Sequence, residues 1–123
     1  MVAVLVGVLT GMARNERKRR ALDAATVDLV CDRDGITRTL GDGREEQVHW
    51  ASLQEVEVLV TARGPVLVLA GPGEDGCLVP VALAAEHGVV TRLHELPRFD
   101  GHAFRAGLEA PPQTRTTCWR RVG

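Results

Sequence analysis

From Val27 onward, hydrophobic and polar residues alternate in short runs, with a period of two that is typical of β-strands with one buried face. Turn sequences rich in Gly and Asp separate the runs, as expected because these residues suit tight turns. The pattern predicts a hairpin over 27–40, a third strand that ends at Trp50, and a fourth strand through Val56, Val58 and Val60.

Two further runs extend this strand-rich part of the chain. Residues 65–71 are apolar at almost every position, which is typical of a central strand or of one covered on both faces. Residues 77–83 predict a sixth strand, and Pro80 places it at a sheet edge or a bulge because proline lacks an N–H group. The loop 71–76 carries two acidic residues and precedes a strand, so it does not match a phosphate-binding loop.

The period then changes to three and four residues, which predicts a helix from Ala82 or Leu83 to Leu96, ended by Pro97. A second, shorter helix is expected after Asp100, whose carboxylate can cap free N–H groups. Two aromatic residues at this helix start have the spacing of a hydrophobic staple and are expected to be structural: Phe99 and Phe104. The sequence RTTCWRR at 115–121 predicts a closing strand.

Consecutive strands followed by a helix indicate an α+β domain. We expect a strongly bent antiparallel sheet, or a partly open barrel, of six or seven strands that is covered by a C-terminal helix. Trp50 lies where such a sheet would bend, and a large aromatic side chain there is expected to fill the volume that the bend opens. The 123 residues fit one domain, which we place at 21–123, after an N-terminal apolar and basic segment at 1–20.

The N-terminal segment has thirteen apolar or small residues followed by a basic run, Arg14, Arg17, Lys18, Arg19 and Arg20. A helix of that apolar length spans about 20 Å, short of the roughly 30 Å of a bilayer core. Three interpretations stay open. The segment packs on the domain or on a second copy of the chain, it lies on a membrane surface with its basic residues on anionic lipid, or it is part of a longer transmembrane helix. The first interpretation predicts a homo-oligomer formed through residues 1–20.

The net charge of −1 conceals an uneven distribution, because residues 1–20 hold five basic side chains and one acidic one. The remainder of the chain is acidic, so its surface is a poor match for nucleic acid, and we expect no nucleic-acid partner. Two pairs of carboxylates, Glu45 with Glu46 and Glu55 with Glu57, are expected on solvated faces of their strands.

Residues that could carry chemistry are few and scattered. Cys31, Cys77 and Cys118 are odd in number and far apart, which indicates reduced core cysteines and an intracellular protein. Neither these cysteines nor the four histidines show the spacing of a metal site. Ser52, the single serine, has no G-x-S-x-G context. We therefore predict no enzymatic activity, no metal site and no cofactor.

Residues 34–60, DGITRTLGDGREEQVHWASLQEVEVLV, resemble small bacterial pleckstrin-homology-like (PH-like) domains. The later sequences LHELPRFDGHAFRAGLEA and TTCWRR are similar to the end of a stand-alone group of uncharacterised bacterial proteins. The resemblance covers about residues 27–120 and rests on packing motifs, so it implies a PH-like fold and says little about activity. The chain departs from the plain PH pattern in having a second short helix and a strand-like tail after the main helix.

Together these features predict a non-enzymatic protein-interaction module in a bacterial cytoplasm, with a protein partner whose identity the sequence does not give. The alternative is a membrane-peripheral domain held at the inner leaflet by residues 1–20. Because the turns of the domain are acidic on balance, lipid headgroups are not expected to bind its body.

Overall fold

The computed structural model describes residues 26–122. Over this range the chain forms, in order, β1 (Thr26–Cys31), β2 (Gly35–Leu40), β3 (Glu45–His49), a 3₁₀ turn η1 (Trp50–Ser52), β4 (Glu55–Thr61), β5 (Gly64–Ala70), β6 (Gly76–Pro80), α2 (Val81–Glu86), α3 (Val89–His94), α4 (Gly101–Leu108) and β7 (Arg115–Arg120).

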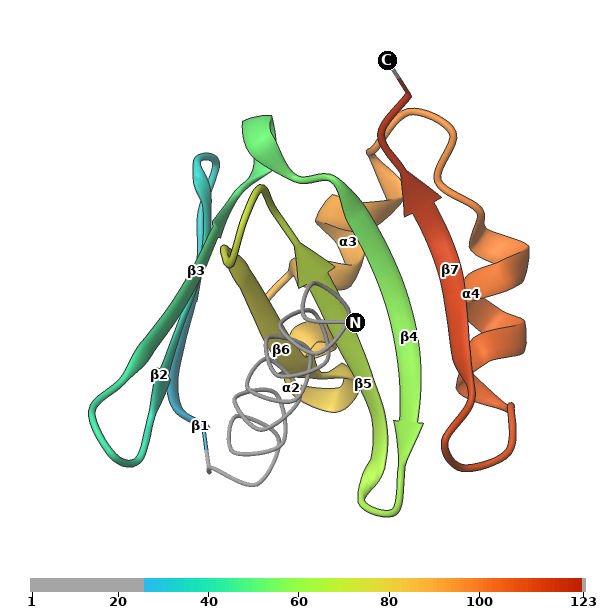
Figure 1. The fold of residues 1–123 in the computed structure, drawn as a ribbon, viewed down its shortest axis with the longest axis horizontal. Helices are drawn as coiled ribbons and strands as arrows, with labels where there is room; N and C mark the ends of the chain where they lie inside the picture. The colour runs from blue at the N-terminus through green and yellow to red at the C-terminus, as the bar shows by residue number, and fades with distance from the viewer. Residues whose placement is uncertain (1–25, 123) are drawn as a thin grey trace, which may run out of the picture.

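The strands form two antiparallel sheets, which stand at an angle to each other and do not close into a barrel (Figure 1). The first sheet has the order β1-β2-β3, and the second has the order β6-β5-β4-β7. The predicted α+β class is confirmed. The strands are divided between two sheets, however, because η1 interrupts the chain between β3 and β4 and turns it into a new direction.

Individual strand predictions agree closely with the structure. The run 65–71 was expected to be central, and β5 lies between β4 and β6. Pro80 was expected at an edge, and it ends the edge strand β6. The predicted sixth strand was too long, since residues 81–83 already belong to α2.

The expected long helix is divided into α2 and α3 by Gly88. This residue has φ of 79°, a left-handed conformation that no α-helix can continue through. Both halves still bury an apolar stripe, with Ala84 from α2 and with Val89 and Leu93 from α3. The periodicity therefore indicated the buried face correctly and missed the break.

The main core lies between the inner faces of the two sheets and the three helices of the described range (Figure 1). Alternate residues of β4 and β5 point into it, including Val58 and Leu67, neither of which is exposed. Trp50 is 5% exposed and lies in this core at the junction of the two sheets. Its Nε1 donates to the carbonyl of Asp32 at 2.9 Å, so the ring also joins the β1–β2 turn to η1.

The C-terminal part is fixed by α4 and β7. Asp100 caps α4 by accepting a hydrogen bond from the Ala103 N–H at 2.9 Å. The rings of Phe99 and Phe104 lie 5.9 Å apart across the cap. Trp119 of β7 donates to the carbonyl of Pro97 at 2.7 Å, which joins the last strand to the turn before α4.

Candidate functional site

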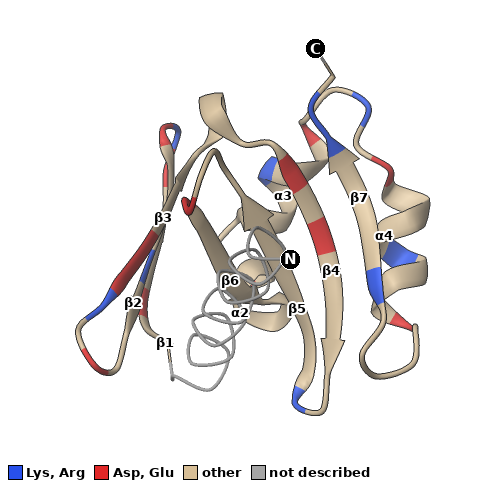
Figure 2. Cartoon of the chain, viewed as in Figure 1, with Lys and Arg blue, Asp and Glu red and all other residues tan. Residues whose placement is uncertain are grey.

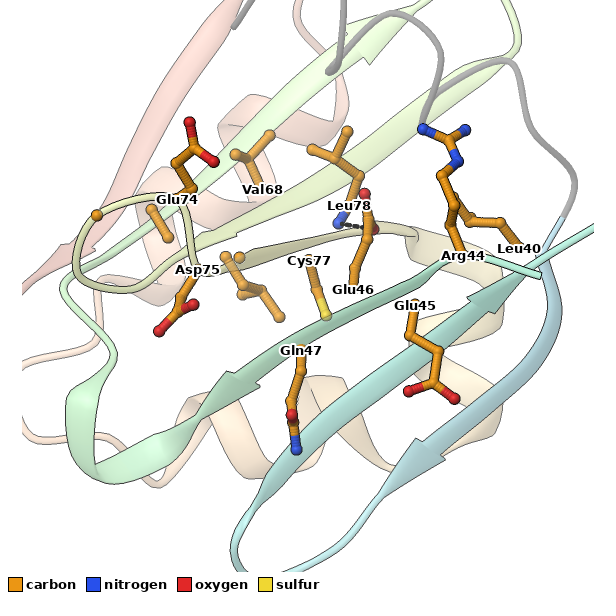
Figure 3. Close-up of a pocket in the computed structure, with 14 residues that line it drawn as sticks. Leu40, Arg44, Glu45, Glu46, Gln47, Val68, Glu74, Asp75, Cys77 and Leu78 are labelled. Atoms are coloured by element: carbon orange, nitrogen blue, oxygen red, sulfur yellow. Dashed lines mark hydrogen bonds between the residues drawn. The ribbon is translucent and has the colours of Figure 1, made fainter. Parts of the chain in front are cut away.

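The edges of β3 and β6 come together without a backbone ladder. β6 lies against β2 and β3, yet the two strands belong to different sheets. The backbone N–H of Leu78 on β6 donates to Oε1 of Glu46 on β3 at 2.9 Å (Figure 3). A side-chain carboxylate thus takes the place of a strand partner at this point, and it leaves the sheets joined at a corner.

Glu46 is held in position by Arg38, which is only 2% exposed. The guanidinium donates to Oε1 of Glu46 at 3.0 Å and, through Nε, to the hydroxyl of Thr26 at 2.6 Å. Glu46 itself is 17% exposed, so the expectation that its carboxylate is solvated was wrong. Glu57 also departs from that expectation, because it is 15% exposed and paired with Arg115 at 2.9 Å.

The sequence carried a signal for the buried arginine. Ile36, Arg38 and Leu40 are alternate residues of β2, so one charged side chain shares a strand face with two apolar ones. A buried charge needs a partner of opposite sign, and Glu46 is the residue directly across from Arg38 in the β2–β3 register.

The second sheet has apolar residues on its outer face as well. We call this group the outer apolar cluster, and it consists of Leu59, Val66, Val68 and Leu78. It lies on the side of β5 opposite to Leu67 and Leu69, because successive strand residues point to opposite faces. The three helices of the described range pack on the Leu67 side, where they contribute to the main core.

Where the first sheet stands against this outer face, the surface has an open hollow of about 640 Å³, which we call the corner groove (Figure 3). One wall comes from Leu40 and residues 44–47, the floor includes Val68 and Leu78, and the rim is the loop 73–76 between β5 and β6. The groove therefore combines an apolar floor with the edges of two strands.

Carboxylates outnumber guanidinium groups around the corner groove. Its lining residues include four acidic residues and one basic residue, namely Glu45, Glu46, Glu74, Asp75 and Arg44. Acidic residues lie along β3 and β4 and in the loop before β6 (Figure 2). Glu46 points toward Leu78, whereas Glu45 points to the other face of the sheet (Figure 3). Because Glu46 is paired with Arg38, the negative charge of the groove comes mainly from Glu74 and Asp75 on its rim, and this charge attracts cations and repels phosphate.

The three cysteine thiols of the described range are unsuited to nucleophilic chemistry. Burial raises the pKa of the Cys77 thiol to about 12 and that of Cys118 to about 11. Burial, and then the nearby Asp32 carboxylate, also raise the pKa of Cys31. All three thiols are therefore protonated at neutral pH, and a protonated thiol is a poor nucleophile. Residues 26–122 contain no group of three or more His, Cys, Asp or Glu residues placed to hold a metal ion.

The residues singled out in the sequence do not meet in one place. Trp50 lies at the sheet junction, with the Arg92 guanidinium 5.1 Å from its ring centroid, while Phe99 and Phe104 lie at the start of α4. The predicted basic contacts Arg14, Arg17, Lys18, Arg19 and Arg20 lie outside the described residues. The corner groove was not predicted, although the acidic character of the turns around it was.

Comparisons of the chain with protein-family models, with curated proteins and with solved structures found no match. Within residues 26–122, no helix is long and apolar enough to cross a bilayer. The geometry and charge of the corner groove are therefore the features from which we infer a function.

Proposed function

We propose that this chain is a non-enzymatic, PH-like protein-interaction module of a bacterial cytoplasm. Its corner groove binds a segment of a protein partner that combines apolar and basic residues. The observation that carries this proposal is the combination, in one hollow of about 640 Å³, of an apolar floor and an acidic rim.

The apolar floor supports a protein segment as the ligand. Val68 and Leu78 form an aliphatic floor and are 7% and 6% exposed, and aliphatic surface contributes about 25 cal/mol to binding for each Å² that is removed from water. The edges of β3 and β6, which have no backbone ladder between them, add backbone groups that can bond to an extended chain, as in strand addition. Glu46 already occupies one of these groups, so the pairing with a ligand would be partial.

The acidic rim determines which segments fit. Glu74 and Asp75 are exposed in the loop that precedes β6, where they can approach a basic side chain. The same charges disfavour nucleic acid and anionic headgroups at this site. The rim would then supply selectivity and speed of association.

The test measures binding of the full chain to a labelled synthetic peptide in which a leucine–alanine run precedes a run of arginines, by fluorescence anisotropy. Asp75→Lys changes the rim, and Glu109→Lys makes the same charge change at the exposed end of α4. We expect Asp75→Lys to weaken binding about fivefold, because it reverses one charge of the rim. Glu109→Lys should leave the affinity within about twofold.

Two results would overturn the proposal. The first is equal binding by Asp75→Lys and Glu109→Lys, which would move the contact away from the groove. The second is no binding of the peptide together with salt-sensitive sedimentation of the full chain on anionic vesicles. That result would favour the alternative, a membrane-peripheral domain held at the inner leaflet by residues 1–20.

A further inference from the structure

The outer apolar cluster is less exposed than the position of the helices explains. Val66, Val68 and Leu78 are 8%, 7% and 6% exposed, although the described helices pack on the opposite face of the sheet. β5 is apolar on both faces, and such strands are normally covered on both sides. The helices of the described range therefore do not account for the low exposure of this face.

The chain itself contains a segment with the right chemistry. Residues 1–13 are apolar or small, and five basic side chains follow by residue 20. Apolar residues suit the floor of the corner groove, and basic residues suit the carboxylates of its rim, including Glu74 and Asp75.

The described chain begins beside the groove, because Thr26 pairs with Leu40, which lines it. The described chain begins at Thr26, whose hydroxyl accepts a hydrogen bond from Arg38, the partner of Glu46. Only residues 21–25 separate the basic run from this point. A tethered segment reaches a nearby site at an effective concentration in the millimolar range, far above that of a free partner.

We infer that residues 1–13 of the same chain cover the outer apolar cluster and that the basic residues 14–20 lie against the acidic rim. This inference rests on the proposed function and adds regulation to it, because the chain's own segment and the partner then compete for one groove. A partner binds only when the segment leaves, so the measured affinity is the intrinsic affinity multiplied by the open fraction.

The first experiment locates the segment in the full chain by nuclear Overhauser effects between methyl groups. We expect contacts from residues 1–13 to Val68 and Leu78. A mixed sample of isotope-labelled and unlabelled chains distinguishes contacts within a chain from contacts between copies. The absence of these contacts, or their appearance only between labelled and unlabelled chains, would overturn the inference.

The second experiment opens the groove without removing the segment. Leu5→Asp combined with Val8→Asp places charge in the apolar run, and Val27→Asp makes a matched change on the 64% exposed Val27 of β1. We expect the double variant to bind the leucine–alanine–arginine peptide about tenfold more tightly than the parent, as for a segment that covers the groove about nine-tenths of the time. Val27→Asp should bind like the parent.

The outcomes separate this inference from the proposed function. If parent and double variant bind the peptide equally, and Asp75→Lys weakens both, the groove binds a partner and the segment does not regulate it. If the methyl contacts are present within one chain and no variant binds the peptide, the segment covers the groove and the proposed partner class is wrong. Loss of the methyl contacts on addition of anionic vesicles would assign residues 1–20 to the membrane.

Discussion

Trp50 connects the two sheets through a single side chain. Its ring is buried in the main core, and its N–H group bonds to Asp32 in the β1–β2 turn. We predict that Trp50→Ala lowers the free energy of unfolding by about 3–5 kcal/mol, the range for removing a large buried aromatic group. Urea unfolding followed by circular dichroism measures the change.

Trp50→Phe provides the matched control, because it keeps most of the apolar volume and removes the hydrogen bond to Asp32. It should cost clearly less than Trp50→Ala. If Trp50→Ala unfolds like the parent and instead loses affinity for a partner, then Trp50 is a recognition residue and the packing assignment is wrong.

Cys77 makes stability depend on pH in the alkaline range. Burial, and then the nearby Glu46 carboxylate, raise its pKa to about 12, above the ordinary value of 9.0. Between these values the unfolded chain releases the proton and the folded chain keeps it, so the free energy of unfolding falls as pH rises. The slope for one such group approaches about 1.4 kcal/mol per pH unit.

We therefore predict that the urea midpoint of the reduced protein decreases steadily between about pH 8 and pH 10. Cys118, whose pKa rises to about 11, contributes to the same decrease. Cys77→Ala should make the slope shallower without abolishing it. A slope that is identical in parent and variant would show that the Cys77 thiol does not titrate as its burial implies.

The burial of some individual residues could be predicted from the sequence, whereas the pairing of others could not. The alternation of Val56, Val58 and Val60 indicated the buried face of β4 directly, since all three are buried. The pairing of Arg38 with Glu46 was missed because a charged residue in a strand is normally solvated, and only the cross-strand register brings these two together. Register depends on turn geometry, which hydrophobic alternation does not specify.

At the scale of elements, α4 approaches the second sheet through a glycine. A Cβ atom on Gly107 would lie 3.0 Å from Cβ of Thr116 and 3.1 Å from Cβ of Val58. In an exposed helix, replacing Gly by Ala would stabilise by about 0.5–1 kcal/mol. Here the added methyl group has no space, so we predict that Gly107→Ala destabilises the domain by about 1–3 kcal/mol, as overpacking does.

Gly101→Ala is the control for this prediction in the same helix. A methyl group added at Gly101 would have its nearest neighbour 3.8 Å away, in the His94 ring, which is an ordinary contact distance. Thermal unfolding should therefore show a lower midpoint for Gly107→Ala and little change for Gly101→Ala. Equal midpoints for the two variants would mean that α4 can move away from β4 and β7 at little cost.

Most elements could be predicted from the sequence, because each is defined by a local pattern. The start of α4 followed from Asp100 and its flanking aromatics, and β7 from a short alternating run. The break at Gly88 was less accessible, because an isolated glycine within a helical pattern is often tolerated. Its positive φ lies at the junction of α2 and α3, and hydrophobic periodicity does not encode a backbone angle.

At the scale of the whole molecule, both sheets and the three helices of the described range share one main core. We therefore predict one cooperative unfolding transition and a far-UV circular dichroism spectrum dominated by strand. Tryptophan fluorescence, which reports on Trp50 at the sheet junction and on Trp119 in the second sheet, should give the same midpoint as circular dichroism. Two resolved transitions would mean that the sheets unfold separately.

The corner groove is formed by several elements together, and for that reason the sequence did not predict it. Its parts are Leu40 of β2, the acidic loop 73–76 and the outer side chains of β5 and β6, which come from separate stretches of the chain. Each part has a local signal, such as the apolar outer face of β5 or the acids of its loop. Their meeting depends on the angle between the sheets, which η1 and the bond from Leu78 to Glu46 establish.

The position of β7 bears on how the protein is made on the ribosome. This last strand pairs with β4, about sixty residues earlier, so β4 is synthesised long before its neighbour is available. Until then its edge is open to other nascent chains, and charged side chains along such an edge oppose that pairing. Glu55 and Glu57 stand on β4 during this interval, and each later pairs with an arginine of β7, Arg120 or Arg115. The same two carboxylates would thus protect the growing chain from aggregation and then fasten its final strand.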